Sequence, residues 1–490
     1  MLFTSPVFLF VFLPLLLIAY YLSPRSLHVK NAIALAASIV FFSWGEPVFV
    51  WALMIGVYID YRVSLLIGPN ARYSEQTKRW ALIVAICLNV ATLIASKYLD
   101  FIVTEIINPL SPWLHWQVQP PKWPLLLGIS FITFHRISYL VDSYKGRAIP
   151  PRGFLDCALY IFLFPQLIAG PIIRYHDIGH QIHDRTHTLE KFLTGFFRFS
   201  VGFAKKTLFA DPLGLVTEKV FNVAPHDLST LAAWGGIVAY TLQIYFDFSG
   251  YSDMALGLGR MMGFQFPENF NRPYISRSVT EFWRRWHISL SNWMRQYLYI
   301  PLGGNRVSIP RTYLNLWVVF VISGVWHGAS WTFIAWGAYY GFFLSLERML
   351  ENSRVGTIRL PGFSRHIYTL LVVMVGWVLF RSPSIAYAGT YLGAMFMPAF
   401  GQAPVGPPWG LIFGNRDLAT MVLGAFIACV DWPYIPGAMA DTFRQAFAGK
   451  FSSESLSQMT LQFGASLFLF VVAVAATISS DYSPFLYFRF

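Results

Sequence analysis

Long apolar runs separated by short polar loops recur along most of this chain. An α-helix of about 20 residues crosses the hydrocarbon core of a bilayer and satisfies its own backbone hydrogen bonds there. The runs predict membrane-spanning helices at Pro6–Leu22, Asn31–Trp44, Val48–Ile67, Trp80–Ser96, Leu125–Val141, Leu231–Phe248, Tyr313–Leu344, Ile367–Phe380, Leu418–Val430 and Leu461–Ile478. The pattern therefore predicts an all-α polytopic membrane protein with about 11 or 12 transmembrane and re-entrant helices.

One apolar segment, Gly153–Tyr175, is interrupted within the block Phe164–Pro171, which contains two prolines and a glycine. Proline cannot donate a helical hydrogen bond, and irregular backbone at membrane depth is tolerated only where protein or a cavity surrounds it. This segment predicts a half-spanning, re-entrant element.

Composition excludes two other classes of protein. Of the 490 residues, 56% are hydrophobic and 12% are charged, which excludes a water-soluble protein. The net charge of +12 would suggest nucleic-acid binding in a soluble protein, but here the Lys and Arg residues lie in short loops and set topology. Cys87, Cys157 and Cys429 lie in apolar runs without metal-like spacing, so they predict no disulfide framework.

The distribution of basic residues predicts an orientation. One set of loops carries Arg25, Lys30, Arg72, Lys78, Arg79, Lys145, Arg147 and Arg152. The opposite loop, residues 100–123, has Lys122 as its only basic residue. Because cytosolic loops are enriched in Lys and Arg, the N-terminus is expected on the periplasmic side. The segment Met1–Leu22 lacks a basic n-region and a cleavage site, so it predicts a first anchor and not a cleaved signal.

Four histidines cluster in a polar insert: His176, His180, His183 and His187. A helix would place all four near one face, together with Asp177 and Asp184. Such a face could bind a divalent metal or form an amphipathic interfacial surface. The insert has no cysteine and no H-E-x-x-H pattern, so the sequence favours the surface and predicts no metal site.

Two carboxylates, Asp247 and Asp253, lie in the glycine-rich block Tyr245–Gly259 directly after an apolar run. Carboxylates near membrane depth must be paired or hydrated. They either line a substrate-binding cavity or cap helix ends at the interface, and the sequence leaves both interpretations open.

The most basic stretch, Arg272–Arg311, is expected on the cytosolic side and contains an amphipathic pattern. Its apolar residues recur every three to four positions, at Trp283, Trp286, Leu290, Trp293 and Tyr297. This period predicts one continuous helix in the interface or lining a funnel, with His287 at its apolar–polar boundary. The following turn, Leu302–Arg306, has amides and an arginine that could hold a phosphate.

His327 places an ionisable imidazole inside the long apolar run, between Gly324 and Gly328. An ionisable residue at membrane depth is a functional-site hypothesis by default. From Tyr313, a rise of ~1.5 Å per residue would bring a helix to His327 after roughly 20 Å, past the midplane. The run is too long for one untilted crossing, so we expect a helix break or strong tilt near the two glycines.

A family resemblance is spread over nearly the whole chain. The blocks that carry it are Gly128–Phe131, Ile137–Gly146, Phe164–Pro171, Tyr245–Met254, Pro267–Tyr274, Glu281–Leu290, Trp326–Gly328 and Ser483–Phe488. In these blocks the chain resembles the membrane-bound O-acyltransferase (MBOAT) family, and most closely its bacterial alginate O-acetylation branch. The pairing of Trp286–Ser289 with Trp326–Gly328 is the most specific part, and the histidine cluster lies outside the family pattern.

The resemblance implies a single integral-membrane acyltransferase domain over residues 1–490, with N-terminal helices at 1–122, a core at about 123–345 and C-terminal helices at about 346–490 around a central channel. It implies transfer of acetyl from a cytosolic thioester, acetyl-coenzyme A, across the bacterial inner membrane to an exported exopolysaccharide of the alginate or acetylated-cellulose type. The implied partners are periplasmic acetyltransferases, the export machinery and membrane lipids. No tightly bound cofactor is implied.

The resemblance also places the family's invariant histidine at His327 and the second histidine of its bacterial branch at His287. We expect His327 to be the general base that removes the acceptor hydroxyl proton, and His287 to position or polarise the thioester carbonyl. The expected substrate-binding residues are Trp283, Arg284, Arg285, Asn292, Arg306, Trp326, Asp247 and Asp253. The arginines suit the donor's phosphates, although they could equally anchor the loop at the lipid headgroups.

Two other functional classes stay open at this point. One is a transporter for the acyl group, which would also bury polar residues near the midplane, but no inverted repeat is apparent. The other is a scaffold whose periplasmic partner does the chemistry. Within the family, the alternative is another acceptor, such as teichoic acid.

Overall fold

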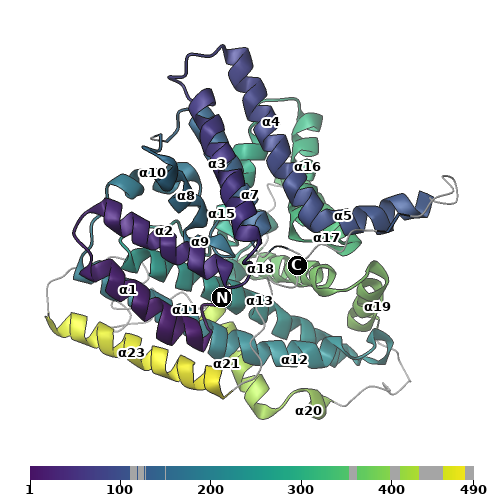
Figure 1. Ribbon diagram of the computed structural model, residues 1–490. Helices are drawn as coiled ribbons and strands as arrows, with labels where there is room; N and C mark the ends of the chain where they lie inside the picture. Colours follow the sequence, from purple (N-terminus) through teal and green to yellow (C-terminus); the bar gives the residue numbers. More distant parts are fainter. Residues whose placement is uncertain are drawn as a thin grey trace. The chain divides into compact units, whose positions relative to one another are not determined.

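The computed structural model describes residues 1–110, 118–119, 126, 128–148, 150–351, 361–397, 409–429 and 456–479. Within these ranges every regular element is a helix (Figure 1), as the hydrophobic pattern predicts. Lys122, the expected boundary between residues 122 and 123, and the block Ser483–Phe488 lie outside the described residues.

Five of the described helical segments are long and apolar enough to cross a membrane. They are Phe49–Ile67, Glu75–Leu110, Ile309–His327, Gly362–Arg381 and Thr460–Ile478. Two shorter apolar segments, Phe8–Leu22 and Leu27–Ser43, precede them. All seven coincide with runs from which the sequence predicts spans, and they identify a membrane protein.

The chain forms two compact units. Unit 1 comprises Met1–Phe196 and Met254–Pro267, and unit 2 comprises Phe197–Asp253 and Glu268–Phe490. Both candidate histidines, His287 and His327, belong to unit 2. The four clustered histidines belong to unit 1.

Unit 1 is built mainly from the N-terminal helices. Its elements are a π-helical turn at Phe8–Phe12, α1 (Leu13–Leu22), α2 (Leu27–Ser43), α3 (Phe49–Ile67), α4 (Glu75–Leu93), π-helical turns at Ile94–Tyr98 and Ile102–Ile107 flanking α5 (Leu99–Phe101), α7 (Ile129–Tyr144), α8 (Phe154–Phe162), α9 (Phe164–Leu167) and α10 (Tyr175–His183). Helices α3, α4 and α7 pack side by side (Figure 1). Helix α9 is a single turn that ends at Leu167, and Gly170 follows with a φ of 101°, so the break expected in this block is present.

Unit 2 contains most of the remaining helices. They are α11 (Leu189–Ala204, which begins in unit 1), a π-helical turn at Lys205–Ala210, α12 (Asp211–Phe221), α13 (Thr230–Met261, which ends in unit 1), α14 (Val279–Arg285), α15 (Ile288–Met294), a π-helical turn at Arg295–Tyr299, α16 (Ile309–His327), α17 (Trp331–Glu351), α18 (Gly362–Arg381), α19 (Ile385–Phe396), α20 (Trp409–Ile412), α21 (Asn415–Cys429) and α23 (Leu456–Ile478). Helix α17 packs against α14, α16 and α18.

The long run that contains His327 folds as a helical hairpin. Helix α16 ends at His327, and Gly328 leaves the helical conformation before α17 begins. A Cβ atom on Gly324 would collide with the backbone oxygen of Phe333, and one on Gly337 would collide with the backbone oxygen of Phe320. The break expected near the two glycines therefore lies at Gly328, and Gly324 permits close approach of the α17 backbone.

Candidate active site

His327 is the last residue of α16, and its side chain is buried among aromatic rings. The imidazole centroid lies 4.8 Å from the Trp326 ring, 5.1 Å from the Trp336 ring and 5.1 Å from the Phe380 ring. These rings come from α16, α17 and α18 of unit 2. An ionisable side chain at the end of an apolar helix is therefore held away from lipid, as an intramembrane functional group must be.

His287 lies at a break between two helices, and the prediction of one continuous amphipathic helix is wrong. Helix α14 ends at Arg285 and α15 begins at Ile288, with His287 in the left-handed region at φ 44°. The Asn271 backbone N–H donates to the Arg285 oxygen (2.9 Å), and the Ile288 N–H donates to the Asn269 oxygen (2.9 Å). The distant segment 269–271 thus supplies the hydrogen bonds that the break would otherwise lose.

The left-handed conformation of His287 is a local strain at a buried polar site. A non-glycine residue there costs roughly 1–2 kcal/mol, and such residues concentrate at functional sites. The break turns the His287 ring inward, where it is 1% exposed and lies edge-to-face with the Phe248 ring at 4.7 Å. A histidine at the boundary of a straight interfacial helix would have stayed partly hydrated.

Asn269 fixes the tautomer of His287. The Asn269 Oδ1 atom accepts hydrogen bonds from the Ser289 backbone N–H (3.3 Å) and hydroxyl (2.8 Å), and its Nδ2 donates to the Ser252 hydroxyl (3.0 Å). Because a backbone N–H can only donate, the atom facing it must be the amide oxygen. The same oxygen lies 3.0 Å from His287 Nδ1, which must therefore carry the proton.

The other nitrogen of His287, Nε2, consequently presents a lone pair. It is buried and has no hydrogen-bond partner among the described residues. His287 lies outside the apolar spans, and burial lowers its pKa to about 3, so the ring is neutral near neutral pH. This geometry disfavours the expected polarising role, because a lone pair repels a carbonyl oxygen and cannot donate to it. A positioning role through an N–H or O–H of a ligand stays compatible with it.

The two histidines meet at Trp326. The Trp326 ring centroid lies 6.2 Å from that of His287 and 4.8 Å from that of His327. The structure therefore brings His287 together with Trp326 and His327, which lie much further along the chain, and the sequence singled out all three. Trp283 belongs to the same aromatic cluster, since its ring lies 5.6 Å from that of Trp336.

Asp247 and Asp253 lie inside α13 and not at its ends, so the helix-capping interpretation is wrong. Lys206 Nζ lies 2.8 Å from Asp247 and 2.6 Å from Asp211. Asp253 accepts from Arg198 Nε (2.6 Å) and from Lys205 Nζ (2.6 Å). Both carboxylates are buried in ion pairs, as the cost of burying a charge requires.

The remaining expected substrate-binding residues lie nearer the surface. Arg284 and Arg306 are exposed, and Asn292 is half-buried. Arg285 bonds to Glu281 (3.0 Å) and to the Asn271 carbonyl (3.2 Å). The expected turn before Arg306 is present, with Gly303 and Gly304 at φ 107° and 55°.

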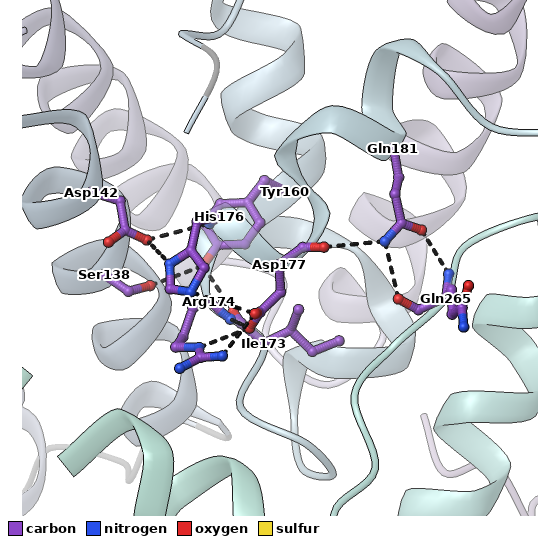
Figure 2. A network of polar contacts seen from close by, with 9 residues as sticks. All are labelled: Ser138, Asp142, Tyr160, Ile173, Arg174, His176, Asp177, Gln181 and Gln265. Carbon is purple, nitrogen blue, oxygen red and sulfur yellow. Dashed lines mark hydrogen bonds and ion pairs between the residues drawn. The ribbon is translucent and has the colours of Figure 1, made fainter. Parts of the chain in front are cut away.

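The histidine cluster in unit 1 does not form one helical face, because α10 ends at His183 and His187 follows it outside the helix. His176 Nδ1 lies 2.8 Å from Asp142, and its Nε2 lies 3.5 Å from Asp177, as Figure 2 shows. His183 lies 3.4 Å from Asp156, and His187 Nε2 lies 2.9 Å from the Tyr20 hydroxyl. Among the described residues no group of three or more His, Cys, Asp or Glu side chains could hold a metal ion.

Sequence reasoning missed two residues of the site. Asn269 lies within the family block Pro267–Tyr274, but its neighbours in sequence give no sign that it orients a histidine. Trp336 looks like an ordinary apolar residue of a membrane helix until the hairpin sets its ring against His327. Both contacts depend on tertiary packing.

The comparisons identify the class of protein. The pattern of the membrane-bound O-acyltransferase family matches residues 81–380, a range that includes both histidines. The chain is also similar over its full length to a relative described below. Together, the two matches show that the chain belongs to this family, so it is a membrane-bound O-acyltransferase.

The names of three relatives refer to alginate, peptidoglycan and teichoic acid. The chain is 40% identical to a probable alginate O-acetylase from Azotobacter vinelandii over 100% of both chains. It is 35% identical to a peptidoglycan O-acetyltransferase from Helicobacter pylori, over 81% of this chain and 80% of that protein. It is 27% identical to a teichoic acid D-alanyltransferase from Bacillus subtilis, over 60% of this chain and 75% of that protein.

Proposed function

We propose that this protein O-acetylates an exported exopolysaccharide of the alginate or acetylated-cellulose type, with acetyl-coenzyme A as the cytosolic donor. The observation that carries the proposal is the pair of buried histidines, His287 and His327, around Trp326 in a chain similar over its full length to a probable alginate O-acetylase. Two imidazoles held out of lipid suit a reaction that moves a proton near neutral pH.

In the proposed reaction His327 is the general base. It takes the proton of the acceptor hydroxyl while that oxygen attacks the carbonyl carbon of the thioester. The electron pair of the carbonyl π bond moves onto the carbonyl oxygen. When this pair returns, the carbon–sulfur bond breaks, and the thiolate takes the proton from the His327 imidazolium. The products are the acetyl ester and free coenzyme A.

His287 positions the donor in this proposal. Its bare Nε2 lone pair suits an amide N–H of the pantetheine arm, which would hold the thioester beside His327. The exposed guanidinium groups of Arg284 and Arg306 suit the donor's phosphates, because guanidinium forks match phosphate geometry.

Replacing Asn269 by alanine is expected to lower the rate of acetyl transfer by about 10-fold to 100-fold, because the side chain that orients the His287 ring is lost. Without the amide oxygen the His287 ring can turn, and its Nδ1 proton is no longer held in place. The Asn269→Asp variant keeps an acceptor for Nδ1–H and should retain more activity than Asn269→Ala. Steady-state kinetics of the two purified variants check this order, and equal losses in both would contradict it.

The cellular setting follows from the same proposal. The whole chain would act as one acyltransferase domain in the bacterial inner membrane, with its N-terminus in the periplasm and a channel between the two histidines. The partners would be periplasmic acetyltransferases, the export machinery and surrounding lipid.

The test of the proposal is transfer of labelled acetyl from acetyl-coenzyme A by the purified protein in lipid nanodiscs. Release of free coenzyme A together with labelled acetyl ester on alginate oligomers is the expected result. Protein that binds acetyl-coenzyme A without breaking the thioester would instead be a transporter or scaffold. Loss of acetyl esters from one surface polymer in a deletion strain identifies the acceptor.

A second acceptor is favoured by a specific observation. The 35% identity to a peptidoglycan O-acetyltransferase extends over 81% of this chain, whereas the identity to the teichoic acid D-alanyltransferase is 27% over 60% of it. Peptidoglycan fragments therefore belong in the same assay. Preferential acetylation of those fragments would replace the exopolysaccharide as the acceptor.

A further inference from the structure

Three buried hydrogen-bond donors lie together beside His327 and lack a partner among the described residues. They are the indole N–H groups of Trp283 and Trp336 and the hydroxyl of Tyr340. These side chains are 7%, 1% and 0% exposed. Buried polar groups in native proteins are nearly always hydrogen-bonded, so a group of three without partners points to a ligand or water that supplies an acceptor.

The three rings form one packed cluster. Trp336 and Tyr340 are one turn apart on α17, with ring centroids 5.2 Å apart. The Trp283 ring, from α14, lies 5.6 Å from Trp336 and 4.9 Å from Tyr340. Trp336 also lies edge-to-face with His327 at 5.1 Å, so the cluster begins next to the proposed base.

Neighbouring aromatic residues show that the fold can satisfy such donors. The hydroxyl of Tyr339, the residue before Tyr340, donates to the Val372 carbonyl at 2.9 Å. The Trp234 indole N–H donates to the Met395 carbonyl at 3.0 Å. Unit 2 can therefore supply partners for buried aromatic donors, although the described residues supply none for Trp283, Trp336 and Tyr340.

The chemistry of the donors limits the ligand. An indole N–H can only donate, so the ligand must present an acceptor, and an oxygen is the common one. All three donors are neutral and buried, which suits a carbonyl oxygen or the oxyanion formed from it, whereas a phosphate or carboxylate would call for arginine or lysine.

We propose that Trp336, with Trp283 and Tyr340, binds the carbonyl oxygen of the acyl thioester and stabilises the negative charge that this oxygen gains during attack. The inference rests on the proposed function and deepens it. It assigns to these donors the polarising role for which the His287 tautomer is unsuited. The covalent changes remain those given above, with the donors holding the oxygen while the electron pair resides on it and releasing it when the carbon–sulfur bond breaks.

The kinetic test is made in the full-length protein. It compares aromatic residues whose N–H donor has a hydrogen-bond acceptor among the described residues with those whose donor has none. Trp336→Phe is expected to lower kcat by about 100-fold, the effect of removing one oxyanion donor, with KM changed much less. Trp283→Phe should act in the same direction. Trp234→Phe, which removes a satisfied indole outside the cluster, should leave kcat unchanged within a few-fold. Equal kcat in Trp336→Phe and the wild type would overturn the proposal.

A tyrosine pair separates ligand binding from folding. Tyr340→Phe removes a hydroxyl without a partner, so kcat should fall while the melting temperature stays constant or rises. Tyr339→Phe removes a satisfied hydroxyl, so the melting temperature should fall while kcat is kept. If both variants lose stability and activity in parallel, the hydroxyl of Tyr340 is structural and the proposal fails for it.

Infrared difference spectroscopy tests the contact itself. In the inactive His327→Ala protein, bound acetyl-coenzyme A labelled with ¹³C at its carbonyl should show a C=O stretch at lower frequency than in water. Adding Trp336→Phe should move the band back towards the value in water. If bound acetyl-coenzyme A shows the same C=O stretching frequency in both proteins, this inference is overturned, but the proposed function is not. Absence of any binding in all variants would overturn the proposed donor, and the inference with it.

Discussion

His327→Ala is expected to lower the rate of acetyl transfer by about 10²-fold to 10⁴-fold, the usual contribution of a general base. The other imidazole beside Trp326, that of His287, is a poor replacement base because burial lowers its pKa to about 3. The donor should still bind, because the residues proposed to hold it are untouched. Transfer of labelled acetyl to polymer oligomers at saturating acetyl-coenzyme A measures the effect on kcat.

The alanine variant also leaves space between the rings of Trp326, Trp336 and Phe380, which lowers stability by itself. His327→Gln is the matched control, since it keeps most of the side-chain volume but has no basic nitrogen. Both variants should elute as monodisperse protein and should lose activity to a similar extent. A glutamine variant with near-normal kcat would remove His327 from the reaction as a base.

The membrane spans are predictable from sequence because a bilayer imposes a simple rule. A run of apolar residues of sufficient length must be helical there, whatever its neighbours are. The run at Val48–Ile67 accordingly matches α3, and the run at Ile367–Phe380 lies within α18. The break after His327 was also predictable, because the run was too long and contained two glycines.

The position of His287 was not predictable from the pattern around it. The helical period continues from Trp283 to Trp293, so nothing local separates α14 from α15. The break depends on a single residue in the left-handed region and on hydrogen bonds from Asn269 and Asn271, which lie far along the chain. Periodicity predicts which face of a helix is apolar, but it cannot predict hydrogen bonds from a segment that is distant in sequence.

The aspartates of α13 illustrate the same limit for charges. The sequence shows that Asp247 and Asp253 need compensation, but it does not say from where. The compensating cations, Arg198, Lys205 and Lys206, come from α11 and the π-helical turn after it.

Replacing Lys206 by methionine is expected to destabilise the protein by about 3–5 kcal/mol, the usual cost of removing one partner of a buried ion pair. Lys206 is 3% exposed, and its ammonium lies within 2.8 Å of both Asp211 and Asp247. Methionine fills the space but leaves both carboxylates buried without that charge. A fall in the thermal unfolding temperature and in the yield of monodisperse protein measures the effect.

The adjacent lysine is a matched control. Lys205→Met removes one cation from Asp253, but the Arg198 guanidinium remains within 2.6 Å of that carboxylate, so the loss of stability should be clearly smaller. Combining Lys206→Met with Asp211→Asn and Asp247→Asn should restore much of the lost stability, because no buried charge of this cluster is then left uncompensated. If the triple variant also keeps kcat and KM, Asp247 stabilises α13 and does not bind substrate. A triple variant that folds but is inactive would instead support a substrate-binding role for Asp247.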